Sequence, residues 1–562
     1  MSIVKNLDTL VRSALAELDI LAPESIVFEH PADLSHGDFS TNVAMSLAKQ
    51  VQQNPKDLAE KIQFAISKNL SQEIEKITVA GPGFINFYLA KPFFQKAIPE
   101  ILEKENDFGK TNILTDKKIL VEHSSLNLFK PFTVGHMMNN AIGESLVRLM
   151  QFSGANVATM AFPSDISLGI AKAIFVLLEK YGSDFIADDV KILGNAYVEG
   201  TQRYTDDESI HIQVKEIADN LYAKKESPEL EIFEKCKKLN IAYFESVLQK
   251  LGSHFDTYIY ESEAGNVGKE IIQKNTPGIF TESQGAIVYI PEESKKHINT
   301  AVFINSQGNP TYEAKDIGLL QLKFERIHPD VSIFVTDHEQ IPHFQIVLDA
   351  GEKIQKDWSE KSVHMTHGRM NFKGQKMSSR LGGVPLAEDM LQAVSEEVKE
   401  RSTHNDSAEV YESIAIGAIK FSILRAKPGQ NINFDPETSL SFEGDSGPYL
   451  QYTHARICSL IEKGAGLNIH PNYHTGEISD LEKMLYRFPE IVESAITGYA
   501  PQHVVTYLLE VARAFNSFYG ANQIVDVSNK DVSQHRLAVA RATQIILKNG
   551  LYLLGIKAPE KM

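Results

Sequence analysis

The chain has 562 residues, and its 73 acidic against 56 basic side chains give a formal net charge of −17. A chain of this length exceeds a single hydrophobic core, so we expect about three domains. The 43% hydrophobic fraction excludes global disorder, the two cysteines exclude a disulfide framework or a cysteine-rich zinc site, and no apolar run is long enough to span a membrane. The first residues lack a basic head followed by an apolar block, so we expect no signal peptide and a cytoplasmic location.

Residues 1–112 predict a small α+β domain. Residues 43–48 follow a run of small polar residues that suits a helix cap. Residues 77–80 and 84–89 are largely apolar and flank Gly81-Pro82-Gly83, a pattern typical of two strands joined by a turn.

From residue 113 to about 440, short apolar strands alternate with longer helices, which is typical of an α/β domain with a mostly parallel sheet. The pattern predicts a buried strand over 118–122 and a helix over 143–152. Residues 175–275 are charged and helical, as an insertion or a crossover would be. Further strands are predicted over 286–291, 301–304 and 332–336.

After about residue 440 strands almost vanish from the pattern. Amphipathic helices are predicted over 449–463, 501–519 and 536–554, which indicates a helical bundle over 441–562. Residues 511–562 hold seven basic and three acidic side chains, hence +4. This part of an acidic chain can therefore attract the phosphates of a nucleic acid.

Familiar phosphate-binding and metal-binding patterns are missing from the sequence. It has neither Gly-x-x-x-x-Gly-Lys-Ser/Thr nor Gly-x-Gly-x-x-Gly after a strand, and Gly382-Gly383 is predicted to be a plain turn. His338 and His343 are five residues apart without acidic or cysteine partners close by, so a metal site is not favoured.

Two other segments could carry chemistry. Residues 124–136 join the strand at 118–122 to the next helix, and free N–H groups at such a junction favour phosphate oxygens. Gly135 would allow close approach and His136 would project from the first turn, although a capping histidine fits the pattern equally. Residues 373–383 form a basic loop with two hydroxyls, which could neutralise charge on a triphosphate or be an ordinary solvated loop.

Together, in this order, the two segments resemble the signatures of class I aminoacyl-tRNA synthetases, and most closely those of arginyl-tRNA synthetases. The motif Ser-Ser-x-Asn-x-x-Lys-Pro-x-x-x-Gly-His is present as residues 124–136, and the variant Lys-Met-Ser-Ser-Arg as residues 376–380. Residues 81–86 are similar to the family's amino-terminal domain. Residues 445–457, 536–543 and 555–562 resemble the start and end of its anticodon-binding domain.

The resemblance implies an α/β multidomain fold in three parts. These are an α+β domain over 1–112 that binds the tRNA elbow, a Rossmann-like parallel-sheet catalytic domain over 113–440 with a helical insertion around 175–275, and an all-α anticodon-binding bundle over 441–562. It implies an arginine–tRNA ligase that converts L-arginine and ATP to arginyl-adenylate and transfers the arginine to the 3′ terminal adenosine of tRNA(Arg), releasing AMP and pyrophosphate. The implied cofactor is Mg²⁺ bound with ATP, without a structural metal, and the family is usually monomeric and activates its substrate with tRNA bound.

The resemblance also implies the arginine-binding residues Asn127, Tyr312, Asp316 and Gln340. Elementary chemistry agrees with two of them. Tyr312 and Asp316 are one helical turn apart and can face one pocket, and a carboxylate pairs with the planar guanidinium through charge-assisted hydrogen bonds that the lysine ammonium cannot reproduce.

For ATP and the reaction, the resemblance implies two groups of residues. The catalytic group is Lys130, Thr133, His136, Lys376 and Arg380, and the ATP-binding group is Gly135, His136, Lys376, Met377 and Ser378. Thr133 replaces the first histidine of the family signature, and Ser379 replaces a catalytic lysine whose role Lys130 is expected to take. Residues 163–170 match the family's Gly-Asp-Trp-Gly-Thr-Gln-Phe-Gly clearly at Asp165 alone.

These departures suggest one alternative, an RNA-binding paralogue without ligase activity, which would not need an arginine pocket. A second alternative, a nucleotidyltransferase acting on a small molecule, would share the histidine turn. It would not explain the helical carboxyl-terminal part or the Tyr312–Asp316 pair.

Overall fold

The computed structural model describes residues 3–562 apart from positions 184, 187, 296–297, 374–385, 403–406, 468, 472–476 and 527. The chain divides into two compact units. The first comprises residues 1–108, 456–488 and 510–547, and the second comprises residues 109–455, 489–509 and 548–562. Within the described ranges, no helix is both long and apolar enough to cross a bilayer.

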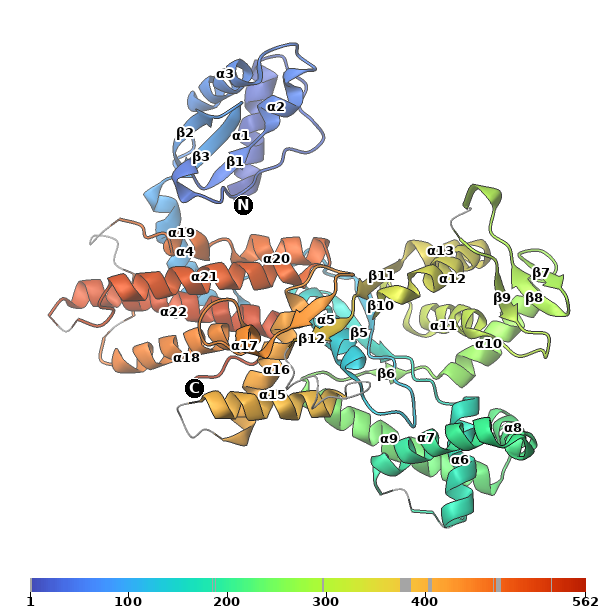
Figure 1. Cartoon of the computed structure of the whole chain (residues 1–562). Coiled ribbons are helices and arrows are strands. Elements are labelled where there is room, and N and C mark those ends of the chain that lie inside the picture. Colours follow the sequence, from blue (N-terminus) through green and yellow to red (C-terminus); the bar gives the residue numbers. More distant parts are fainter. Residues whose placement is uncertain are drawn as a thin grey trace. The chain divides into compact units, whose positions relative to one another are not determined.

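The amino-terminal part of the first unit is an antiparallel sheet covered by helices, as the sequence predicts. The strands run in the order β1 (Phe39–Thr41), β3 (Phe84–Leu89), β2 (Ile74–Ala80), with α1 (Ile3–Glu17), α2 (Val43–Ala48) and α3 (Pro55–Ser67) gathered around them (Figure 1). Phe39 and Phe87 are buried in this core. Gly83 has φ +130° in the predicted turn, a conformation that favours glycine.

Helices dominate the rest of the first unit. The long helices of the carboxyl-terminal region are α18 (Gly447–Lys463), α21 (Pro501–Ala521) and α22 (Lys530–Leu553), close to the predicted ranges, and each has one end in the second unit. The first unit also contains α4 (Lys91–Lys104) and α19 (Glu482–Leu485), whereas α20 (Phe488–Thr497) belongs almost wholly to the second. Within the first unit, Arg456 Nη1 donates to Asn516 Oδ1 at 2.7 Å, and Gln544 Nε2 donates to Cys458 Sγ at 2.9 Å. These bonds tie the three long helices together.

The second unit is built on a parallel sheet of five strands. Their spatial order is β6 (Thr257–Tyr258), β5 (Asn156–Ala161), β4 (Lys118–Glu122), β10 (Val331–Asp337), β11 (Ser362–His367). Every adjacent pair is parallel. Numbered along the chain, the order is third, second, first, fourth, fifth, so the connection reverses direction between β4 and β10. In such doubly wound sheets, ligands bind at the carboxyl ends of the strands at this switch point.

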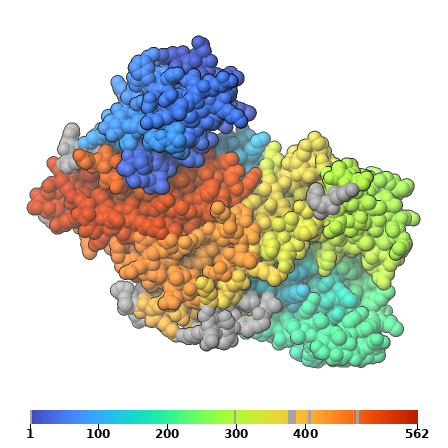
Figure 2. Space-filling model, turned by 45° about the horizontal axis from the view of Figure 1, so that its top comes forward, coloured from blue at the N-terminus to red at the C-terminus, as the bar shows by residue number. Residues whose placement is uncertain are grey.

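Helices α6 (Leu168–Tyr181), α7 (Val190–Asp206), α8 (His211–Tyr222) and α9 (Pro228–Lys250) follow β5 and pack on one another as a lobe of the second unit (Figures 1 and 2). The helix-rich character predicted for residues 175–275 is confirmed by these helices and by α10 (Glu261–Lys274). The remaining long helices of this unit are α5 (Val134–Phe152), α11 (Tyr312–Ile327), α12 (Ile341–Ile354), α15 (Ala387–Arg401) and α16 (Ala408–Leu424).

Of the three later strands predicted, one joins the parallel sheet. The strand over 332–336 is part of β10, whereas β8 (Ala286–Tyr289) and β9 (Ala301–Ile304) form a separate antiparallel sheet with β7 (Phe280–Ser283). Gln284 and Gly285, which join β7 to β8, have φ of 50° and 78°. Two consecutive residues of positive φ make a tight hairpin turn, and this turn reverses the chain where a parallel sheet needs a crossover.

Helices α10 and α11 approach each other at two glycines, and this contact positions the helix that carries Tyr312 and Asp316. A Cβ on Gly268 would overlap the carbonyl oxygen of Ala314, and a Cβ on Gly318 would overlap that of Ala264. The two backbones are therefore packed too closely for any side chain at these positions.

We predict that Gly268→Ala lowers the free energy of unfolding by about 1–3 kcal/mol, because the added methyl group forces the helices apart. Denaturant unfolding measures this change. Gly194→Ala in α7 is the matched control, since a Cβ there meets nothing within 4 Å. Equal unfolding midpoints for the two variants would contradict the close contact.

Candidate functional site

The loop between β4 and α5 is fixed by hydrogen bonds to its neighbours. Leu128 N donates to Ser164 O at 3.1 Å, and Ser164 N donates to Leu126 O at 2.8 Å, so the loop after β4 is paired with the loop after β5. Phe129 has φ 63°, and its N–H donates to the side-chain oxygen of the buried Asn240 at 2.6 Å. The backbone beyond β4 is therefore held in one shape.

Thr133 and His136 form a capping box at the start of α5. Thr133 is the N-cap, and its Oγ1 accepts the N–H of His136 at 3.4 Å. In return, the Thr133 N–H donates to Nδ1 of His136 at 3.1 Å. Each residue satisfies a helix-end N–H that would otherwise lack an acceptor.

This cap also determines the state of the imidazole. Burial, with the Lys130 ammonium adding to it, lowers the pKa of His136 to about 4, so the ring is neutral at pH 7. Because Nδ1 accepts the Thr133 N–H, the proton of the neutral ring lies on Nε2. His136 therefore offers an uncharged N–H donor at a helix N-terminus, an arrangement suited to a phosphate oxygen.

Two further predicted residues lie on the same loop. Asn127 is half-buried, and its carbonyl accepts the N–H of Lys130 at 3.2 Å. Lys130 is exposed, with its Nζ 5.1 Å from the ring centroid of Tyr197 on α7. The Lys130 ammonium therefore lies beside α7 of the helical lobe. Gly135 is exposed in the first turn of α5.

Asn139 was not predicted, although it connects the two strands of the switch point. Its Oδ1 accepts the N–H of Ser124, just beyond β4, at 2.9 Å, and its Nδ2 donates to the carbonyl of Val335 on β10 at 2.8 Å. It lies three residues after His136 on α5, and residues at this spacing share a helix face. The three-residue spacing between His136 and Asn139 is the feature of the sequence that could have predicted this role.

Asp316 of α11 lies near a buried ion pair at the carboxyl end of β4. Glu122, the last residue of β4, pairs with Lys323 of α11. Burial raises the pKa of Glu122 and the Asp316 carboxylate raises it further, while Lys323 opposes both effects. Asp316 is thus close enough to the end of β4 for its charge to be felt there.

His343 of α12 lies between two carboxylates of α11. Its Nε2 is 2.6 Å from Asp316 Oδ2, and its Nδ1 is 3.6 Å from Glu313 Oε1. The expectation that His343 lacks acidic partners is therefore wrong, because folding brings it to Asp316, which is 27 positions away in the chain. Within the described ranges, no group of three or more His, Cys, Asp or Glu side chains could hold a metal ion.

The other predicted arginine-binding residues are less enclosed. Tyr312 opens α11, and 70% of its surface is exposed, with the Nζ of Lys315 5.0 Å from its ring centroid. Gln340 is exposed and ends the short helix η5 (His338–Gln340) directly after β10. The structure thus places Asn127, Asp316 and Gln340 near the switch point, while the ring of Tyr312 extends into solvent.

The second signature falls outside the described residues. Lys376, Met377, Ser378 and Arg380 all lie in the range 374–385 that the structure does not describe. The divergent segment 163–170 lies within the described residues, and there Asp165 binds side chains and backbone of neighbouring helices. It accepts the N–H of Ser262 at 2.9 Å and the Ser262 hydroxyl at 2.8 Å, and it pairs with Lys237 at 3.2 Å, so it holds the first turn of α10.

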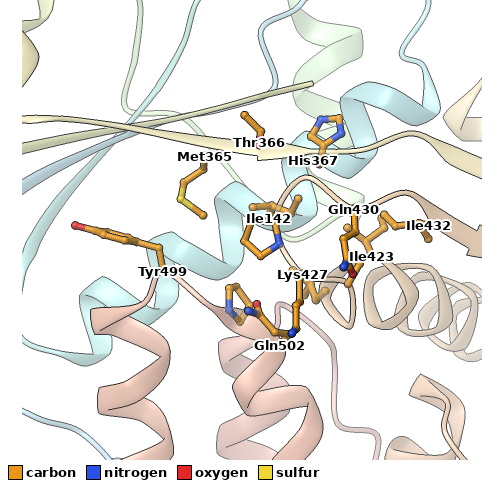
Figure 3. A pocket seen from close by; sticks show the side chains of 14 residues that line it. Ile142, Met365, Thr366, His367, Ile423, Lys427, Gln430, Ile432, Tyr499 and Gln502 are labelled. Atoms are coloured by element: carbon orange, nitrogen blue, oxygen red, sulfur yellow. The ribbon is translucent and has the colours of Figure 1, made fainter. Parts of the chain in front are cut away.

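A separate hollow of the second unit lies near the end of β11 and is shown in Figure 3. Its labelled lining includes Ile142 from α5, Met365, Thr366 and His367 from β11, and Tyr499 and Gln502 near the start of α21. The cavity volume is about 20 Å³, which is room for about one water molecule. It cannot admit arginine or a nucleotide, and the candidate site remains at the switch point.

The strand order and the capped helix at the switch point define a Rossmann-like α/β protein, a class of fold that binds ligands at this edge of its sheet. Family models match three parts of the chain. These are the class I (R) tRNA synthetase catalytic domain over residues 97–435, the DALR anticodon-binding domain over 450–562, and the arginyl-tRNA synthetase N-terminal domain over 5–89. The chain belongs to the arginyl-tRNA synthetase family, a branch of the class I tRNA synthetases.

Individual relatives match nearly the whole chain. It is 30% identical to an arginine–tRNA ligase of Clostridium acetobutylicum, with 98% of each chain covered, and 28% identical to one of Treponema denticola, with 99% and 98% covered. The Thermus thermophilus arginyl-tRNA synthetase structure superposes with a TM-score of 0.80 at 25% identity, covering 99% of this chain and 100% of that one. The predicted fold class is confirmed by these matches and by the parallel sheet.

We predict that Thr133→Val lowers the free energy of unfolding by about 1 kcal/mol and lowers kcat/KM for ATP, because it removes the hydroxyl that caps the His136 N–H. Thermal unfolding and steady-state kinetics measure the two effects. Thr133→Ser keeps the hydroxyl and is the control, expected to stay close to wild type. If the valine and serine variants behave alike, the cap does not position His136.

Proposed function

We propose that the edge of the five-stranded sheet between β4 and β10 binds L-arginine and ATP and joins them as arginyl-adenylate. Membership of the family makes the protein an aminoacyl-tRNA ligase that charges tRNA with arginine, using ATP. One observation supports this location of the site: the Thr133–His136 cap follows the carboxyl end of β4, and the Asp316 carboxylate of α11 is near enough to Glu122, the last residue of β4, for its charge to act there.

The reaction needs two substitutions. The carboxylate of arginine attacks the α-phosphorus of ATP and pyrophosphate leaves, and then a hydroxyl of the 3′ terminal adenosine of tRNA attacks the arginyl carbonyl and AMP leaves. No covalent bond to the protein forms. Catalysis therefore depends on alignment of the two reacting groups and on stabilisation of charge on the phosphates.

Each predicted residue has a role in this proposal. The Nε2–H of His136, the first-turn backbone at Gly135 and Thr133, and the ammonium of Lys130 bind the phosphates from the α5 side. Asp316 receives the guanidinium of arginine, and Asn127, Tyr312 and Gln340 complete the arginine site. Lys376, Met377, Ser378 and Arg380 of the second signature are proposed to close over ATP and the pyrophosphate.

Mg²⁺ is proposed to enter with ATP, bound chiefly to its phosphates. The donor set of the site supports this, since Lys130 and a neutral histidine face the phosphates and neither is an oxygen ligand of the kind that Mg²⁺ prefers. The described residues of the turn before α5 therefore do not fit a dedicated Mg²⁺ site, and we propose that the lysines and the arginine of the two signatures neutralise the remaining charge on the phosphates.

For the partners, we propose the division of labour that the family implies. Residues 1–112 bind the tRNA elbow, residues 113–440 hold the chemistry with a helical insertion around 175–275, and residues 441–562 read the anticodon. The basic character of residues 511–562 supports a tRNA contact there. We also propose that the protein acts as a monomer in the cytoplasm.

Arginine-dependent ATP–pyrophosphate exchange, run with and without tRNA, tests the proposal. We expect exchange when tRNA is present, and we expect Asp316→Asn to raise the arginine KM at least about tenfold, since a charge-assisted hydrogen bond contributes about 1.5–3 kcal/mol. The KM for tRNA should change little in this variant.

Asp256→Asn is the control, because Asp256 is not part of the proposed site. Its Oδ2 accepts the N–H of Thr159 on β5 at 2.8 Å. If the wild-type chain shows no ATP–pyrophosphate exchange with or without tRNA, the result would favour an RNA-binding protein that has lost ligase activity. An equal loss of arginine and tRNA affinity in Asp316→Asn would overturn the assignment of the pocket.

A further inference from the structure

The contact between α11 and α12 joins one imidazole to two carboxylates in a partly buried position. His343 is 18% exposed, Asp316 13% and Glu313 23% as side chains. The 2.6 Å separation of His343 Nε2 from Asp316 Oδ2 is that of a charge-assisted hydrogen bond. The ring stands edge-on to Phe344 at 5.0 Å, which fixes its plane.

This group holds a cation before any ligand binds. An imidazolium between two carboxylates leaves one net negative charge, and exchange of the imidazolium proton for a guanidinium keeps that net charge unchanged. If the imidazolium kept its proton, the bound guanidinium would share Asp316 with a second cation a few ångströms away. Two like charges at that distance repel strongly at a site shielded from water.

We propose that His343 is the resident cation of the arginine site, and that the binding of arginine expels the proton that its imidazolium carries. This inference rests on the proposed role of Asp316 in binding arginine. The proton leaves to solvent and no other bond is made or broken. His343 is thus a positioning residue that holds the two carboxylates together until the substrate replaces its charge.

The titration of His343 is consistent with this exchange. Although burial opposes the charged form, hydrogen bonds and attraction from Asp316 and Glu313 raise the pKa of His343 to about 9. The ring is therefore protonated near pH 7 in the ligand-free protein. A cation bound at Asp316 lowers that pKa, so arginine binding releases protons and strengthens as the pH rises towards 9.

Other titratable groups near His343 do not explain such a dependence. Among the described residues, the groups that act on it are Glu313 and Asp316 of α11 and His364 of β11. Burial, His343 and Lys323 lower the pKa of His364 to about 4, so that ring stays neutral throughout the relevant range. His364 is further held by the Thr336 hydroxyl at 2.7 Å.

The test compares kcat/KM for arginine in tRNA charging by wild type and His343→Gln, between about pH 6.5 and about pH 9. Glutamine keeps an N–H for Asp316 and carries no titrating proton. The ratio of wild type to variant cancels the titration of the arginine α-ammonium, which is common to both. We expect this ratio to rise with pH, by up to about tenfold per unit.

Glu313→Gln provides a second arm, because loss of one carboxylate lowers the pKa of His343 and moves the rise to lower pH. Calorimetry of arginine binding to the wild-type chain with tRNA, in buffers of different ionisation enthalpy, counts the released protons directly and does not depend on any variant folding. A constant ratio, or no proton release, would overturn the inference. Failure of Asp316→Asn to affect the arginine KM would instead overturn the proposed function.

Discussion

The parallel pairing of β4 with β10 is the constraint on which the rest of the site depends. It creates the point where the connections of the sheet reverse, and Asn139 bonds both strands there, at 2.9 Å to Ser124 and 2.8 Å to Val335. Asn139 lies on α5, and this helix begins at the Thr133–His136 cap. Any displacement of β10 relative to β4 would therefore disturb the turn that we propose to bind phosphate and its position relative to the Asp316 carboxylate, which we propose to bind the guanidinium.

Two histidines near the switch point differ in charge because their surroundings differ. His136 is partly buried beside Lys130, and both effects lower its pKa to about 4 and make it a neutral donor. His343 is held between two carboxylates, which raise its pKa to about 9 and make it a cation. In the proposed site, the neutral ring of His136 donates a hydrogen bond to a phosphate, whose negative charge other groups neutralise. The positive ring of His343 pairs with the carboxylates until the guanidinium of arginine replaces its charge.

Local features of the sequence were enough to predict much of this arrangement. The turn at Gly81-Pro82-Gly83, the strand–helix junction at 124–136 and the one-turn spacing of Tyr312 and Asp316 each depend on near neighbours. The partners of His343 could not be predicted, because α11 and α12 meet only through the tertiary packing of the sheet. The separate sheet of β7, β8 and β9 was missed for a similar reason, since its hairpin depends on positive φ at Gln284, a residue that rarely adopts it.

The central claim is that arginine binds between the loop after β4 and helix α11. A crystal structure of the protein soaked with L-arginine tests it most directly. The account predicts electron density with the guanidinium against the Asp316 carboxylate, the α-carboxylate towards the amino-terminal turn of α5, and Asn127 in contact with the main-chain end of the ligand. Arginine bound elsewhere on the chain, with Asp316 and His343 still joined and no ligand between Asn127 and Asp316, would contradict it.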